Sequence, residues 1–126
     1  MTETIEYSIE LEPCAGALDL VDLPELVGAN TKPWFNQTIC RVNDCVVRLG
    51  IVHGDFHWHK HDHEDEFFYV VSGRLIIDIE EGDSIGLSPG QGTLVPRTVV
   101  HRPRAPEKTV MLMFEGAGVM PTGDPD

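Results

Sequence analysis

Basic residues are scarce in this sequence. It carries 9 lysines and arginines against 21 aspartates and glutamates, which gives a formal net charge of −12 with neutral histidines. Binding to a nucleic-acid backbone or to an anionic membrane surface requires a basic face, and the sequence shows none. We therefore expect neither nucleic acid nor membrane as a partner.

Long hydrophobic runs and paired cysteines are also missing. No stretch approaches the roughly 18 to 20 apolar residues that span a bilayer, and residues 1–12 are acidic, unlike a signal peptide. The three cysteines, Cys14, Cys40 and Cys45, form no C-x-x-C pair. These absences predict a cytoplasmic protein with reduced thiols, which we expect to be buried and structural.

No long helical pattern follows Trp34. Instead, 12 glycines and 9 prolines divide the chain into short segments, as is typical of an all-β barrel or sandwich. Asn43 and Asp44 form a candidate two-residue hairpin turn. The predicted strands are residues 38–42, 45–52, 56–61, 66–71, 75–80, 84–87, 93–95, 99–102 and 109–114.

The length of 126 residues fits one compact domain. We expect the barrel to cover residues 34–120 and to be followed by a mobile tail, residues 121–126. Residues 1–33 form an N-terminal extension that packs on the barrel or on a partner subunit. Because a domain of this size buries only about two thirds of its unfolded surface, we expect a homodimer.

Two weaker patterns lie inside the N-terminal extension. Residues 3–12 alternate between apolar and polar side chains, which suits an exposed edge strand. Residues 17–27 allow a short helical turn, but Pro24 interrupts the apolar spacing. The sequence therefore predicts an edge strand here and leaves the helical turn open.

Five of the six histidines lie between positions 53 and 63, all at odd numbers. Side chains at i and i+2 of a strand point to one face, so His59 and His61 could reach one ion together if their segment is extended. Glu66 opens the next predicted strand, and a hairpin over residues 62–65 would bring it beside the histidines as a third ligand. The alternative is an unstructured metal-scavenging tract, but the strand-like surroundings favour a specific site.

Two spacings resemble the motifs of the cupin superfamily. His59 and His61, four residues, Glu66, six residues and Gly73 resemble the first motif. Gly90, five residues, Pro96 and then His101 resemble the second motif. The resemblance covers roughly residues 34–115. Within the superfamily, the sequence is most similar to small single-domain cupins of the mannose-6-phosphate isomerase-like group, whose activities are largely unassigned. The terminal Thr122-Gly123-Asp124 string is similar to that group as well.

The resemblance implies an all-β double-stranded β-helix, the RmlC-like jelly-roll barrel, with a metal ion in its mouth. It implies one divalent transition metal, and ligand type alone leaves Mn, Fe, Co, Ni and Zn open. The ligands that the motifs carry over are His59, His61, Glu66 and His101.

The chain departs from the cupin motifs at two positions. Gly54 stands one residue closer to His59 than usual, and Thr98 replaces the usual glycine of the second motif, which raises the question of whether that turn is altered. An alternative register pairs His57 with His59 and uses Glu64. It would place Val71 where the first motif has glycine, so we favour the register that ends in Gly73.

Three imidazoles and one carboxylate leave one or two coordination positions open for substrate or water. Such a site predicts a metal-dependent enzyme that acts on a small oxygenated organic molecule, of the dioxygenase or the isomerase/lyase type. The alternative is a non-catalytic cupin that binds or senses a small molecule such as a sugar or a carboxylate, because a fold does not specify a reaction.

Further candidates surround the predicted ligands. Arg102 and Arg104 could grip a carboxylate or phosphate of the substrate, although solvated surface charges are an equally open interpretation. Tyr69 could line the substrate pocket or belong to the core or a dimer interface. His57 and His63 could orient the ligands or shuttle protons.

Overall fold

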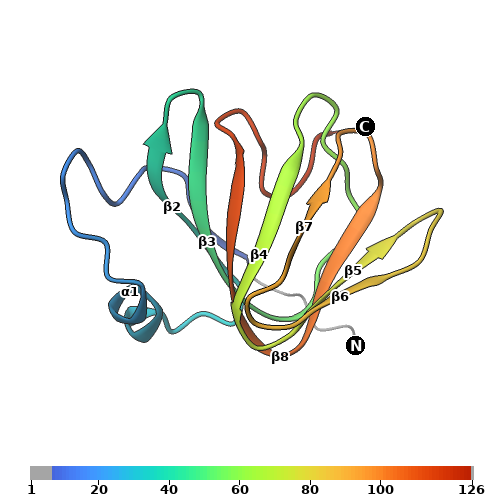
Figure 1. Ribbon diagram of the computed structural model, residues 1–126, viewed down its shortest axis with the longest axis horizontal. Helices are drawn as coiled ribbons and strands as arrows, with labels where there is room; N and C mark the ends of the chain where they lie inside the picture. The colour runs from blue at the N-terminus through green and yellow to red at the C-terminus, as the bar shows by residue number, and fades with distance from the viewer. Residues whose placement is uncertain (1–6, 126) are drawn as a thin grey trace.

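The computed structural model describes residues 7–125. Within them the structure has one helix, and it is too short to cross a membrane. Figure 1 shows the elements in chain order, which are β1 (Ser8–Glu10), α1 (Leu23–Ala29), β2 (Phe35–Val42), β3 (Cys45–Asp55), β4 (Glu66–Ser72), β5 (Leu75–Ile79), β6 (Ile85–Leu87), β7 (Gly92–Val95) and β8 (His101–Gly116).

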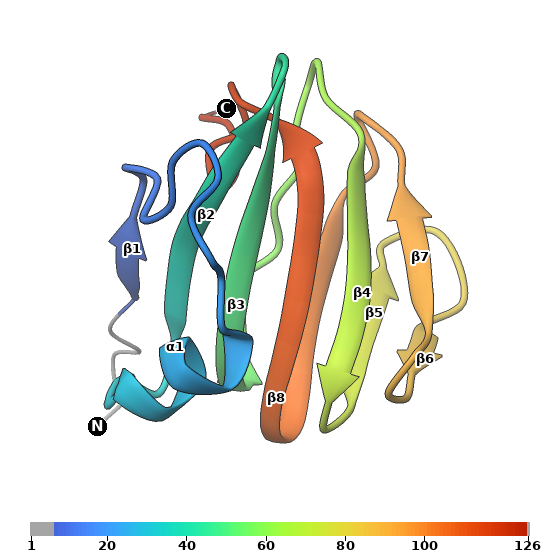
Figure 2. The same cartoon turned by 60° about the vertical axis from the view of Figure 1, so that its left-hand side comes forward.

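Strand β8 organises the whole sheet. Its C-terminal half lies between β3 and β4, and the sheet continues through β2 to β1 on one side and to β7 on the other. Its N-terminal half pairs with β5, which pairs with β6. Because β8 takes part in both groups of strands, the sheet bends over on itself, with β5 and β6 lying behind β4 and β7 in Figure 2. The result is a double-stranded β-helix, the jelly roll that the resemblance implied.

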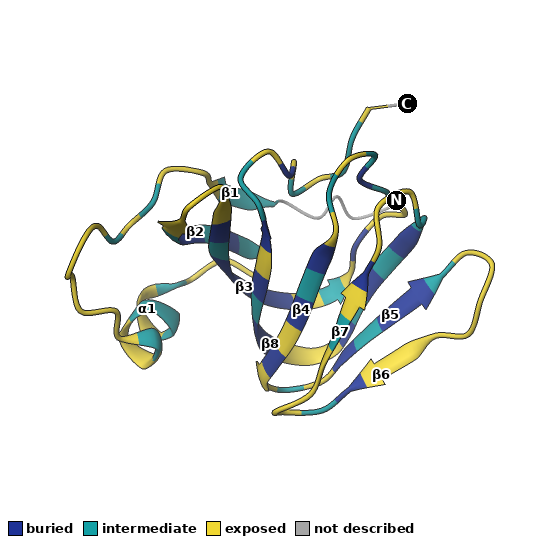
Figure 3. Ribbon diagram, turned by 45° about the horizontal axis from the view of Figure 1, so that its top comes forward, coloured by how far each residue is buried: buried dark blue, intermediate teal, exposed yellow. Residues whose placement is uncertain are grey.

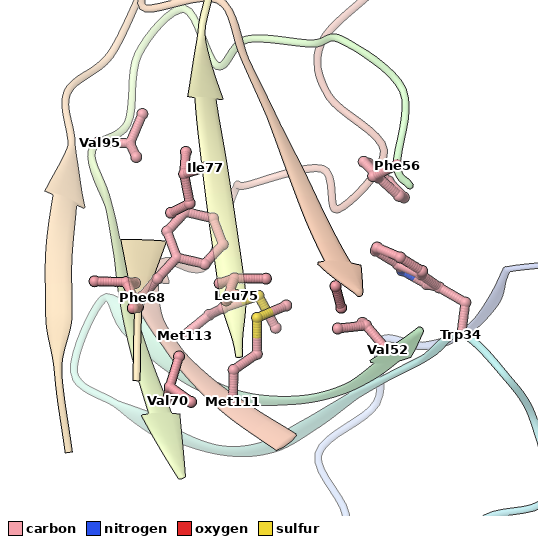
Figure 4. Close-up of a cluster of buried hydrophobic side chains, with 12 residues drawn as sticks. Trp34, Val52, Phe56, Phe68, Val70, Leu75, Ile77, Val95, Met111 and Met113 are labelled. Atoms are coloured by element: carbon pink, nitrogen blue, oxygen red, sulfur yellow. The ribbon is translucent and has the colours of Figure 1, made fainter. Parts of the chain in front are cut away.

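The space between the two layers holds the main core, which Figure 4 shows in close-up. Inward and outward residues alternate along β4, as its burial colours in Figure 3 illustrate. Burying one large apolar side chain contributes about 1.5 to 3 kcal/mol. The core side chains come from most strands of the sheet and are Trp34, Val52, Phe56, Phe68, Val70, Leu75, Ile77, Leu87, Val95, Ala105, Met111 and Met113.

A second apolar cluster lies on the outer face of β2, β3 and β8. Leu49, Ile51 and Val110 are buried there, and Leu23 and Leu26 of α1 pack against the cluster. Helix α1 of the N-terminal extension therefore packs on the outer face of the sheet.

Helix α1 begins later than the apolar spacing indicated. The Asp22 carboxylate accepts a hydrogen bond of 3.0 Å from the Glu25 N–H and caps the helix. Pro24 lies in the first turn, where its missing N–H costs nothing. The prediction that Pro24 interrupts the helical pattern was wrong, because the proline instead starts the helix.

Three strand predictions require correction. Residues 56–61 form no strand and contribute only one isolated bridge, between His59 and His101. The segments 99–102 and 109–114 belong to one continuous strand from His101, because the intervening residues stay extended through the bend of β8. The predicted hairpin over residues 62–65 is also wrong, since β4 pairs with β7 and β8 and not with the histidine segment.

Other local predictions had mixed outcomes. The Asn43-Asp44 hairpin is confirmed, with Val42 and Cys45 paired across it. The edge strand expected over residues 3–12 is restricted to β1, which pairs in parallel with β2, and residues 3–6 lie outside the described part. The cysteines are not buried: Cys14 and Cys45 are exposed, because they lie in a peripheral loop and beside the hairpin turn, and Cys40 is half-buried.

Candidate metal centre

Four polar side chains from three parts of the chain meet inside the jelly roll. His59 and His61 lie on the loop between β3 and β4, Glu66 begins β4 and His101 begins β8. One nitrogen or oxygen atom of each lies within 4.8 Å of the corresponding atoms of the others. The backbone holds this arrangement, because His59 and His101 exchange two N–H···O hydrogen bonds of 3.0 and 2.9 Å.

The cluster is buried and its polar atoms lack conventional partners. His61, Glu66 and His101 are 3%, 4% and 1% exposed, and His59 is half-buried. Nε2 of His61 and Nε2 of His101 each lie 3.6 Å from Oε1 of Glu66, and these three atoms have no hydrogen-bond partner. A buried unsatisfied polar group costs about 1 to 3 kcal/mol. Three such atoms around one point fit a site built to hold a cation.

Backbone carbonyls orient two of the imidazoles. Nδ1 of His59 donates to the carbonyl oxygen of His57 at 3.0 Å, and Nδ1 of His101 donates to that of Val99 at 2.9 Å. Because a carbonyl can only accept, Nδ1 of each ring carries the proton. The Nε2 atoms of both rings are left with a free lone pair, which is the form that binds a metal.

The electrostatics of two members, His59 and Glu66, also favour their metal-binding forms. Burial, with the nearby His101, lowers the pKa of His59 to about 4, so this ring is neutral near pH 7. Burial alone would raise the pKa of Glu66, but the neighbouring side chains of Glu115, His101 and His61 hold that pKa well below its usual value. A neutral imidazole beside a carboxylate is the state that a divalent cation requires.

A pocket of about 590 Å³ reaches the cluster beside His59. Its wall combines the loop between β3 and β4, residues 56–65, with the C-terminal segment. We call this loop the histidine loop, and its Trp58 forms part of the wall. The pocket offers a route by which a small molecule can approach the half-buried edge of the site. Its lining residues are His57, Trp58, His59, Lys60, Val100, Met120, Thr122, Gly123, Asp124 and Pro125.

Comparison with known proteins identifies the family. Residues 47–115 match the family model described as Cupin domain. The chain belongs to the cupin family. All four cluster residues lie within the matched segment, as the motif resemblance predicted; the mannose-6-phosphate isomerase-like subgroup stays a prediction.

Several proteins of known sequence or structure resemble this chain. The uncharacterized protein YdbB of Bacillus subtilis (strain 168) is 39% identical over 80 residues, which cover 64% of this chain and 71% of YdbB. A cupin-2 domain containing protein from Shewanella frigidimarina is 29% identical, with a TM-score of 0.73 over 77% of this chain and 94% of its own. Protein NMB1881 from Neisseria meningitidis is 26% identical, with a TM-score of 0.70 over 78% and 99%.

The sequence analysis missed two residues behind the cluster of this cupin. Glu115 of β8 is the cross-strand neighbour of Glu66. Burial and the Glu66 charge raise the pKa of Glu115 well above its usual value. Arg48 donates to Glu115 Oε1 at 2.8 Å and to the Val119 carbonyl at 2.9 Å. An arginine inside the apolar segment 45–52 was the available signal, since a buried arginine needs an acidic or carbonyl partner.

The structure does not bring three predicted substrate contacts to the cluster. His101 points inward from β8, whereas Arg102 and Arg104 lie on the opposite face and donate to Asp78 of β5 at 2.8 Å each. Tyr69 lies on the outward face of β4 and is 36% exposed. All three side chains face away from the buried histidines.

The two histidines predicted to surround the ligands differ in their placement. His57 lies beside the cluster, with its ring centroid 5.4 Å from that of His59, and its Nε2 donates to the Thr122 carbonyl at 2.6 Å. His63 is exposed on the loop. Glu64 and Asp124, which the sequence analysis did not select as ligands, each place an oxygen within 4.8 Å of a nitrogen of His61.

Proposed function

We propose that this cupin binds one divalent transition metal through His59, His61, Glu66 and His101 and uses it as an enzyme acting on a small oxygenated organic molecule. The observation that carries the proposal is the buried meeting of three imidazoles and one carboxylate whose facing atoms lack other partners. Borderline divalent metals such as Mn, Fe, Co, Ni and Zn suit this ligand set.

The proposed chemistry follows from the shape of the site. When bound, such a metal can polarise a carbonyl, activate water or bind dioxygen, which corresponds to isomerase/lyase or dioxygenase reactions. The protein supplies the geometry, because His59 and His101 are held as Nδ1–H tautomers and Glu66 as a carboxylate. The pocket beside His59 supports entry of a small molecule from one side of the cluster.

Metal content tests the binding part of the proposal. We expect chelator-treated protein to take up about one equivalent of Zn²⁺ or Co²⁺ by elemental analysis. The His59→Ala and His101→Ala variants each lose a ligand, so their affinity should fall by more than the 10- to 100-fold that is typical of losing an outer partner. His53→Ala is the matched control, because His53 is an exposed histidine on β3 outside the cluster.

Two results would contradict the binding proposal. One is equal metal retention by the wild type and by His101→Ala, provided that circular dichroism shows both to be folded. The other is loss of metal from His53→Ala to the same extent. Dioxygen consumption after loading with Fe²⁺, compared with turnover of enolisable carbonyl compounds, separates the two reaction types. A metal-loaded protein that binds a small sugar or carboxylate without turnover would support the non-catalytic alternative.

A further inference from the structure

The C-terminal segment lies directly against the loop that carries two of the cluster histidines. The Thr122 carbonyl accepts a hydrogen bond of 2.6 Å from Nε2 of His57. The Asp124 N–H donates to the Lys60 carbonyl at 2.9 Å, and its carboxylate accepts from the Asp62 N–H at 2.7 Å. Three hydrogen bonds thus fasten a short stretch of tail to a loop that has no sheet pairing of its own beyond one bridge.

We propose that residues 122–124 are a positioning element of the metal centre, which holds His59 and His61 in the orientation that binds the ion. The inference rests on the proposed metal site. The first route runs through His57: its ring is held by Thr122, and its carbonyl accepts the Nδ1–H of His59 at 3.0 Å. The tail therefore holds the residue that sets the tautomer and the orientation of one ligand.

The second route reaches the other histidine of the loop. Nδ1 of His61 is buried without a hydrogen-bond partner, and its Nε2 lies beside Glu66. The carboxylates of Glu64 and Asp124 lie near the same ring, and one oxygen of Glu64 is likewise buried and unpartnered. Because Nε2 faces Glu66, the negative charge of these two further carboxylates near the ring favours a proton on Nδ1. That tautomer directs the lone pair of Nε2 toward the cluster.

The fit at Gly123 indicates that the tail is built to lie on this site. Its φ of +92° belongs to the left-handed region that favours glycine. A Cβ atom added here would clash with the side chain of His59. The glycine therefore allows the backbone of the tail to approach the ligand directly. It also accounts for the Thr122-Gly123-Asp124 string that the motif spacings did not use.

Metal affinity of matched variants tests the proposal. Asp124→Asn removes the carboxylate, and Gly123→Val prevents the close approach to His59. We expect the affinity of each for Zn²⁺, measured by competition with a chelating indicator, to fall 10- to 100-fold, the range typical of outer partners of metal ligands. Asp83→Asn is the control, because it removes the same charge from the exposed turn between β5 and β6 and should bind as the wild type does.

A metal-free measurement separates this inference from the proposed function. Long-range ¹H–¹⁵N NMR of the histidine rings should report an Nδ1–H tautomer for His59 in the wild type. It should report a mixture in a variant truncated after Pro121. If the wild type binds no Zn²⁺, the proposed metal site is wrong, and unchanged tautomers on truncation then overturn the positioning role as well. If the wild type binds Zn²⁺ and Asp124→Asn binds it equally well, the positioning role alone is wrong. Melting curves verify that each variant is folded.

Discussion

Individual residues show how the alternation of side chains along a strand decides what each side chain contacts. His101 and Ala105 of β8 face the interior of the jelly roll. Arg102 and Arg104 lie at the alternate positions and therefore face outward. There they meet Asp78, which accepts hydrogen bonds from both guanidinium groups and one of 2.6 Å from Ser84. The alternation was readable in the sequence, but the identity of the acidic partner on β5 was not.

The pH dependence of stability tests the role of Asp78. Its pKa lies below the usual value, because Arg104, Ser84 and Arg102 donate hydrogen bonds to the carboxylate and outweigh the effect of burial. A lowered folded-state pKa stabilises the protein above about pH 4, the pKa of an unfolded aspartate, and this stabilisation is lost as the pH falls further. In urea unfolding, the wild type should exceed Asp78→Asn in stability at pH 7, and the difference should narrow at pH 3. Equal differences at the two pH values would contradict this account.

At the scale of elements, the histidine loop and the turn before β8 form one unit. The Thr98 N–H donates to the His61 carbonyl at 2.8 Å, and Thr98 has a φ of 71°. The turn therefore keeps the left-handed conformation that suits the glycine of the cupin motif, although a β-branched residue occupies it. The same loop explains why the strand predicted over residues 56–61 is absent: its backbone bonds go to single partners on β8 and the tail and not to a ladder.

Replacing Thr98 tests the cost of this turn. The left-handed conformation costs a non-glycine residue roughly 1 to 2 kcal/mol. Glycine avoids this strain, but it loses more conformational entropy on folding, which offsets part of the stabilisation. Thr98→Gly should therefore raise the free energy of unfolding by about 1 kcal/mol, measured by urea unfolding. Thr98→Ala is the control, because it removes the β-branch but retains a Cβ, and it should change the stability by less. A loss of stability in Thr98→Gly would show that the threonine side chain makes a stabilising interaction of its own.

At the scale of the whole molecule, the described residues cover the outer face of the sheet unevenly. Helix α1 packs on the part formed by β2, β3 and the Val110 region of β8, whereas Leu94 of β7 and Phe114 of β8 are exposed. The exposed part is apolar, and Phe67 of β4 pairs in register with Phe114 and Leu94 on its two neighbours. Phe114 and Leu94 are 42% and 55% exposed. In a chain of net charge −12, such a face is where two copies can approach with the least repulsion.

The homodimer expected from the chain length stays a prediction, which this face makes specific. We expect light scattering to give twice the chain mass of 14.0 kDa. Phe114→Lys would place a charge in the centre of the contact and should shift the mass toward the monomer. Leu20→Lys is the control, because Leu20 is equally apolar but lies in the N-terminal extension, where it is 92% exposed. A monomeric wild type, or a dimer that Phe114→Lys leaves intact, would exclude this interface.

The sequence by itself determined the local features of this protein. The alternation of apolar residues defined most strands, because strand periodicity acts over a few residues, and the resemblance to the cupin motifs implied that His59, His61, Glu66 and His101 meet. Only the tertiary structure decided which side chains share a space. Arg48, Glu115 and Asp124 reach the cluster through the register of β3, β4 and β8 and the return of the tail. Register depends on the packing of the whole sheet, and no short stretch of sequence contains that information.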